Sequence, residues 1–117
     1  MTVVDKKQLI FRINGLVRAI EVNSGLGELD LKARSILSLI GEAEADSLPL
    51  NVSDIVKAPG FGTAPTVYAR LAELEDAGWI KSVPDPRDGR AKRVSLTSQA
   101  RRTFAKMSAE AQKIIAT

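Results

Sequence analysis

The stretch KAPGFG, residues 57–62, constrains the fold more than any other part of the sequence. Pro59 cannot lie inside a helix, because its ring clashes with the preceding turn and it has no backbone N–H to donate. Gly60 and Gly62 favour a tight turn, since glycine adopts positive φ without steric cost. The sequence therefore predicts that any helix before residue 59 ends there and that a new one begins shortly afterwards.

Capping signals on both sides of this break predict two helices. Asn51 precedes VSDIV, and Asp54 follows three residues later, which is a capping pattern with Asp in place of the usual Glu or Gln. Thr63 is a good N-cap for the next helix, and Pro65 falls in its first turn, where a missing N–H costs little. Two helices joined by a glycine-bearing turn are typical of a helix-turn-helix.

The segment after the break predicts a helix followed by two strands. Its apolar positions have helical spacing and form a buried face: Val67, Leu71 and Leu74. Gly78 ends the helix, residues 79–85 (WIKSVPD) form a strand, and residues 93–97 (RVSLT) form the returning strand of a two-stranded hairpin. A hairpin directly after a helix-turn-helix makes a winged helix. We also expect a short extended piece at LPL, residues 48–50.

Amphipathic helices are expected on both sides of this unit. Asp30 caps a helix whose inward positions are Ala33, Ile36, Leu37 and Ile40. Residues 4–22 predict a first helix with an apolar stripe at Leu9, Ile13, Leu16 and Ile20. Thr97 caps a last helix over 98–116 with a heptad stripe at Ala100, Phe104, Met107, Ala111 and Ile114. Apolar stripes of this kind favour association with a second copy.

Composition excludes several classes of function. The 117 residues contain no cysteine and no histidine, which removes disulfides, zinc sites of the Cys/His type and the usual general base. No constellation of Asp, Glu, Lys, Ser, Thr or Tyr suggests catalysis, so we expect neither an enzyme nor a cofactor or metal. The start lacks the apolar core of a signal peptide, and no apolar run is long enough to span a membrane. We therefore expect a cytoplasmic protein.

Charge is distributed unevenly along the chain. The formal net charge is +3, but residues 1–84 carry nine Lys/Arg and eleven Asp/Glu, whereas residues 85–117 carry eight Lys/Arg and three Asp/Glu. A basic last third indicates an anionic partner, although charge alone is equally consistent with a solvated surface.

The chain resembles MarR-type winged-helix transcription regulators over about residues 29–105. The family's wing signature, D-x-R-D-x-R followed by L-T, is filled by Asp85, Arg87, Asp88, Arg90, Leu96 and Thr97. The end of its recognition helix is filled by Leu71, Leu74, Gly78, Trp79 and Ile80. The resemblance implies a mainly α fold with a small β-hairpin wing: one winged-helix domain over 1–117, with a DNA-binding part at 29–97 and dimerisation helices at 4–22 and 98–116.

The same resemblance implies a sequence-specific regulator of transcription, most simply a repressor, that binds double-stranded DNA as a homodimer on a pseudo-palindromic operator. In such a wing, Arg90 enters the minor groove with Asp88 holding its guanidinium, and Arg87, Lys92 and Arg93 meet phosphates. Relatives also bind small-molecule effectors in a cleft built partly by the dimerisation helices. Family members commonly continue into a further helix beyond the position of Thr117, so the sequence leaves an effector open.

The rotation of about 100° per residue in an α-helix indicates which side chains of the recognition helix face outward. With Val67 and Leu71 inward, a turn of about 100° per residue sends Pro65, Thr66, Ala69 and Glu73 outward and leaves Tyr68 and Arg70 on the flanks. The expected DNA contacts on this helix are Thr63, Pro65, Thr66, Tyr68, Ala69 and Arg70. Trp79 is interpreted as a core anchor. The alternative is a winged helix used for protein–protein assembly, which has no need of four cationic residues around the wing tip.

Overall fold

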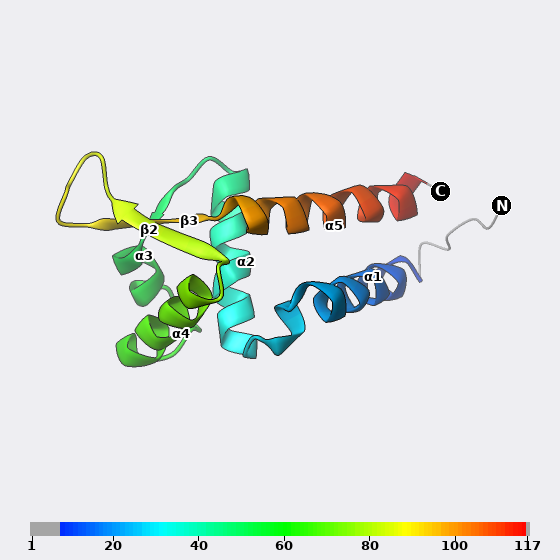
Figure 1. Ribbon diagram of the computed structural model, residues 1–117, viewed down its shortest axis with the longest axis horizontal. Helices are drawn as coiled ribbons and strands as arrows, with labels where there is room; N and C mark the ends of the chain where they lie inside the picture. Colours follow the sequence, from blue (N-terminus) through cyan, green and yellow to red (C-terminus); the bar gives the residue numbers. More distant parts are fainter. Residues whose placement is uncertain (1–7, 117) are drawn as a thin grey trace. The chain divides into compact units, whose positions relative to one another are not determined.

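The computed structural model describes residues 8–116, which form two compact units (Figure 1). Residues 30–100 make up one unit, and the described parts of residues 1–29 and 101–117 make up the other. The expected first helix began at residue 4, and its residues 4–7 lie outside the described part of the chain. Each unit is considered by itself below.

The larger unit begins with three helices, α2 (Leu31–Ala45), α3 (Val52–Lys57) and α4 (Ala64–Asp76). Asp30 caps α2 by accepting hydrogen bonds from the backbone N–H groups of Lys32 and Ala33. Asn51 and Asp54 form the predicted capping box of α3. All three helices therefore begin where the sequence indicated.

The turn between α3 and α4 has the predicted backbone. Gly60 and Gly62 have φ of 93° and 102°. Residues that carry a Cβ atom rarely adopt such positive φ values. Thr63 then caps α4 by accepting from the N–H of Thr66, and Pro65 lies in the first turn. The helix-turn-helix prediction is confirmed.

The core of this unit is formed by the apolar faces of its helices and sheet. The predicted inward positions of α2 and α4 are all buried: Ala33, Ile36, Leu37 and Ile40, and Val67, Leu71 and Leu74. Trp79, Ile80, Val94 and Leu96 add the wing's contribution, with Trp79 only 3% exposed. Trp79 is thus a core residue, as predicted.

The sheet has three strands, not the two that the sequence predicted. β2 (Ile80–Pro84) and β3 (Lys92–Leu96) form the antiparallel hairpin of the wing, with Ile80 opposite Leu96. β1 (Leu50–Asn51) pairs with the other edge of β3, so the order is β1-β3-β2. The expected extended piece at 48–50 is therefore a strand shifted to 50–51, because its pairing is decided by β3 and not by local sequence.

Thr97 joins the wing to the last helix, α5 (Ser98–Ala116). Its hydroxyl donates to the carbonyl oxygen of Gly78 at 2.6 Å and accepts from the N–H of Ala100 at 3.1 Å. Its own N–H donates to the carbonyl oxygen of Trp79. One side chain therefore caps α5 as predicted and also ties the end of α4 to the end of β3.

The smaller unit contains α1 (Leu9–Ser24), the 3-10 helix η1 (Leu26–Glu28) and residues 101–116 of α5. The predicted stripe positions are half-buried: Leu9, Ile13, Leu16 and Ile20 on α1, and Phe104, Met107, Ala111 and Ile114 on α5. On other faces Ile10 and Phe11 are 56% and 70% exposed. Within residues 8–116, no helix is both long enough and apolar enough to cross a lipid bilayer.

Candidate nucleic-acid interface

The outward face of α4 carries small side chains in its first two turns. Pro65 and Ala69 are exposed and Thr66 is half-buried, on the side of the helix opposite Val67 and Leu71. The hydroxyl oxygens of Thr63 and Thr66 lie 3.1 Å apart and are hydrogen-bonded to each other. The face is therefore a narrow ridge that another surface can approach closely.

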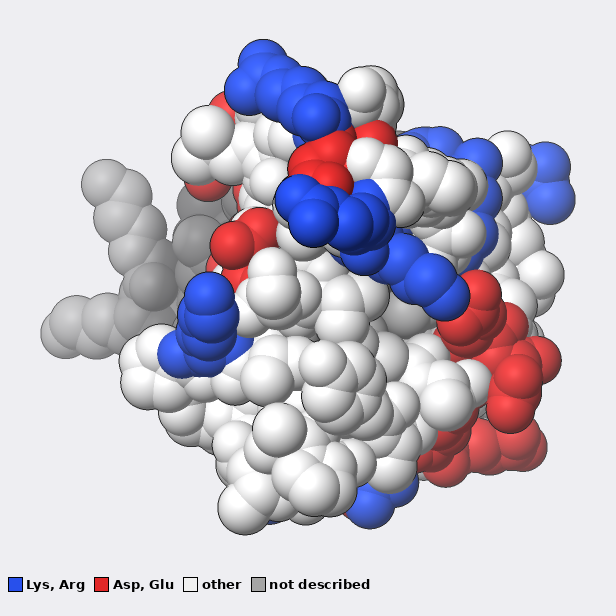
Figure 2. Space-filling model, turned by 90° about the vertical axis from the view of Figure 1, so that its left-hand side faces the viewer, with Lys and Arg blue, Asp and Glu red and all other residues white. Residues whose placement is uncertain are grey.

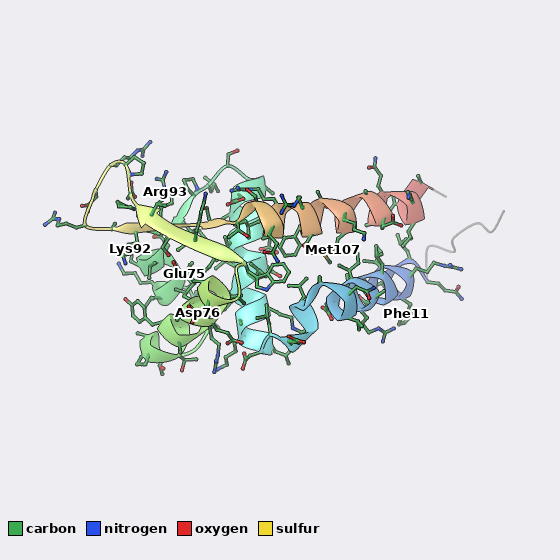
Figure 3. All side chains as sticks on the ribbon, viewed as in Figure 1. Phe11, Glu75, Asp76, Lys92, Arg93 and Met107 are labelled. Atoms are coloured by element: carbon green, nitrogen blue, oxygen red, sulfur yellow. The ribbon has the colours of Figure 1, made fainter. Side chains whose placement is uncertain are left out.

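An open groove lies between α4 and the wing. It has a volume of about 520 Å³ and is lined by Val52, Ser53, Tyr68, Asp88, Arg90, Ala91 and Lys92. Tyr68 is 54% exposed, so its ring and hydroxyl are available from this groove. A smaller hollow of about 200 Å³ adjoins it and brings Lys92 and Glu75 to the same place (Figure 3).

Arg90 is highly exposed at the wing tip. The side chain of Arg90 is 95% exposed, and its Nε lies 3.5 Å from Oδ1 of Asp88. The same carboxylate oxygen accepts from the backbone N–H of Arg90 at 3.1 Å. The contact between Asp88 and Arg90 that the sequence suggested is present, and it holds the arginine by its backbone while leaving the guanidinium in solvent.

The base of the wing is organised by Asp85, which is only 8% exposed. Its carboxylate accepts from the N–H of Arg87 at 2.8 Å and from Nδ2 of Asn51 at 2.8 Å, and Nη2 of Arg93 lies 3.5 Å away. The Arg87 N–H, then the Asn51 amide and the Arg93 guanidinium lower the pKa of Asp85, because each stabilises the carboxylate. The N–H of Asp85 donates to the carbonyl oxygen of Ala91, which closes the wing loop.

Two of the expected DNA-contacting arginines are engaged within the protein. Arg93 is 29% exposed and bound to Asp85. Arg70 is 32% exposed, with Nη1 at 3.1 Å from Oε2 of Glu73 and Nε at 3.6 Å from Oδ1 of Asp30. Arg87, Arg90 and Lys92, in contrast, are exposed. The structure therefore brings α4, Arg90 and Lys92 to one open face and draws Arg70 and Arg93 into the protein.

Charge on this side of the molecule is unevenly distributed. Figure 2 shows most of the Lys and Arg side chains over its upper part, with a few acidic groups among them. Mostly uncharged residues lie below, and a band of acidic residues runs along one edge. Among residues 8–116, no group of three or more carboxylate side chains is arranged to hold a metal ion, and His and Cys do not occur in the sequence. Lys and Arg side chains gathered on one part of a surface create a positive potential there.

Comparison with known proteins identifies the fold. No family model and no curated protein match the sequence. Solved structures match well: MepR of S. aureus in complex with DNA has a TM-score of 0.62 at 20% identity, over 91% of this chain and 83% of MepR. The transcriptional regulator Tm0710 of Thermotoga maritima has a TM-score of 0.67 at 19% identity, over 94% of this chain and 72% of its own. The reduced form of MarR from E. coli has a TM-score of 0.55 at 18% identity, over 100% of this chain and 80% of MarR.

The chain has the MarR-type winged-helix fold. The resemblance found in the wing signature is thus matched by the arrangement of helices and strands over nearly the whole chain. Tm0710 is described as a transcriptional regulator and MepR was solved with DNA, and neither description is that of an enzyme. MepR has also been solved with ethidium.

Sequence reasoning missed three parts of this candidate site. Asn51 was read only as a cap, yet it also binds Asp85. Ser53 lines the groove beside Tyr68. Lys32, in the first turn of α2, places its Nζ only 3.3 Å from the point that a Cβ atom on Gly62 would occupy, and so lies over the turn before α4. No local sequence pattern predicts these contacts, because each joins residues at least 15 positions apart in the sequence.

Proposed function

We propose that this protein is a sequence-specific, double-stranded DNA-binding regulator of transcription that acts as a homodimeric repressor. The observation that carries the proposal is the pairing of an exposed, narrow α4 face with an exposed Arg90 at the wing tip, across an open groove lined by Lys92 and Tyr68. The major groove of B-DNA admits one α-helix, and the adjacent minor groove attracts arginine where it is narrow.

In this proposal each part of the interface has a separate role. Pro65, Thr66 and Ala69 meet base edges in the major groove, where methyl groups can contact the thymine methyl. The groove between α4 and the wing receives the phosphate backbone that separates the two DNA grooves, with Lys92 and Tyr68 as its contacts. Arg90 lies in the minor groove. Arg87, exposed beside the tip, adds a phosphate contact.

The dimer is the second part of the proposal. Two-fold symmetry would present two α4 helices to successive major grooves and would match a pseudo-palindromic operator. The apolar stripes of α1 and α5 and the exposed Ile10 and Phe11 support association through the smaller unit, since a monomer would leave much of this surface in water. We place the protein in the cytoplasm as part of the same proposal, and assign it no cofactor and no effector.

Selection of binding sites from random duplex DNA by the purified protein tests the function. We expect an enriched pseudo-palindrome whose affinity falls steeply with salt, as for proteins that neutralise several phosphates. Binding with no sequence preference would reject the specific regulator. Absence of DNA binding would favour the alternative of a winged helix that assembles with other proteins. Repression is tested by placing the selected site over a promoter in a reporter and expressing the protein.

A further inference from the structure

Four charged residues with different roles lie where one flank of α4 adjoins the start of α2. Asp30 and Lys32 belong to the start of α2, and Arg70 and Glu73 belong to α4. Arg70 is the residue on this flank that the sequence predicts to contact DNA. Its guanidinium, however, pairs with Glu73 at 3.1 Å and lies 3.6 Å from Asp30. The two carboxylates come from two helices, so Arg70 fastens α4 to the N-cap of α2.

Lys32 lies on the same flank as Arg70 and is exposed. Its Nζ lies 3.3 Å from the position of a Cβ on Gly62. The same point is 3.3 Å from the Cγ2 atom of Thr66. The ammonium group therefore lies beside the first turn of α4, where the helix also presents the positive end of its dipole.

We propose that Lys32, and not Arg70, is the phosphate contact on this flank of α4. The inference rests on the proposed function. A helix in the major groove lies between two phosphate backbones, and contacts to the phosphates on each side fix its register. Exposed Lys and Arg side chains are among the groups that make such contacts. Lys92 lies on the wing side, and Lys32 is the exposed cation beside the start of α4 on the other. Arg70 is a positioning residue, which sets the angle of α4 through Asp30.

Salt titration of DNA binding separates these roles, because each phosphate contact contributes about 0.9 to the slope of log affinity against log salt. Lys32→Gln should reduce the magnitude of this slope by about 0.9, so that binding depends less on salt. It should weaken binding to the selected operator and to random duplex by the same factor. Lys32→Arg keeps the charge and should keep the wild-type slope. Arg70→Gln should leave the slope unchanged and lower only the ratio of operator to random affinity, because a misplaced α4 still attracts phosphates.

Lys81→Gln is the matched control, since Lys81 is an exposed lysine of the same unit on β2, outside the residues that line the groove. It should retain the wild-type slope. Lys32 is exposed, so its substitution does not disturb the core, and a thermal melt verifies this. An unchanged slope in Lys32→Gln, or a slope lowered by about one unit in Arg70→Gln, overturns the inference. Wild-type protein that binds no DNA rejects the proposed function itself, so the two failures are distinguishable.

Discussion

The Nδ2 atom of Asn51 donates a hydrogen bond of 2.8 Å to Oδ2 of Asp85, 34 residues further along the chain. Asn51 also closes the capping box of α3, and Asp85 also anchors the wing loop through the N–H of Arg87. One contact therefore connects the start of the helix-turn-helix to the base of the wing. The relative position of these two elements decides whether a helix and a wing tip can enter adjacent grooves together.

Substitution of Asn51 should separate capping from this connection. Asn51→Ala loses both and should lower the free energy of unfolding by at least about 1 kcal/mol, the usual cost of a lost N-cap. Asn51→Ser can still cap α3 but is too short to reach Asp85, so it should be the more stable of the two while binding the operator more weakly than wild type. Urea denaturation measures the change in stability, provided that the m-value is the same for all variants. Titration with the operator measures the change in affinity. Equal stability of both variants would show that the cap contributes nothing.

Acid should weaken the wing through Asp85. Hydrogen bonds from Arg87 and Asn51 lower the pKa of this carboxyl in the folded protein, so the stabilisation is present above its ordinary value of about 3.9 and is lost as pH falls through the lower folded value. Asp85→Asn should be less stable than wild type at pH 7, and the difference should shrink as the pH falls below about 4.

Asp30 contributes acid sensitivity of the same sign. The N–H of Lys32, the N–H of Ala33 and the charge of Arg70 lower its pKa. Some loss of stability in acid should therefore remain in Asp85→Asn. Urea midpoints at pH 7 and pH 3 measure both contributions, and a difference between wild type and Asp85→Asn that grows on acidification would contradict the assignment.

Arg90→Ala should weaken binding to operators with A·T flanks more than to operators with G·C flanks. A narrow A·T-rich minor groove concentrates negative potential, and a guanidinium placed there gains from it. The expected loss is about 1–3 kcal/mol per half-site on A·T flanks. Lys92→Ala is the comparison, since loss of a phosphate contact should weaken all sequences equally and lower the salt slope by about one unit. Equal losses on both flanks would make Arg90 a phosphate contact as well.

Dimerisation should depend on the stripes of the smaller unit. Ile13→Asp or Ile114→Asp places a carboxylate on a half-buried apolar stripe, and either should dissociate the protein. Sedimentation of wild type at micromolar concentration should give the mass of two chains. Ile10→Asp distinguishes the stripe from its exposed neighbour and should have a smaller effect. A monomer at ~100 μM would refute the dimer, because the dissociation constant would then lie above that concentration.

Local signals in the sequence were sufficient for the helices of the larger unit and for the two strands of the wing. Pro59, Gly60 and Gly62 break the chain at one place, Thr63 begins a helix there, and Gly78 ends it with a φ of 83°. Backbone conformation at such positions depends on the residue itself and its near neighbours, and apolar spacing alone decides which helix face is buried. The wing signature indicated the fold class, a winged helix.

Tertiary structure alone decided which charged groups are available. The sequence predicts that Arg70, Arg90 and Arg93 all contact DNA, but Asp30 and Glu73 hold Arg70 and Asp85 holds Arg93. Among these three arginines, Arg90 alone is 95% exposed. Ion pairs between distant residues depend on how α2, α4 and the sheet pack, as does the pairing of β1 with β3. A guanidinium carries the same charge in every sequence position, and only its three-dimensional neighbours determine whether it meets a carboxylate of its own chain or the phosphate of another molecule.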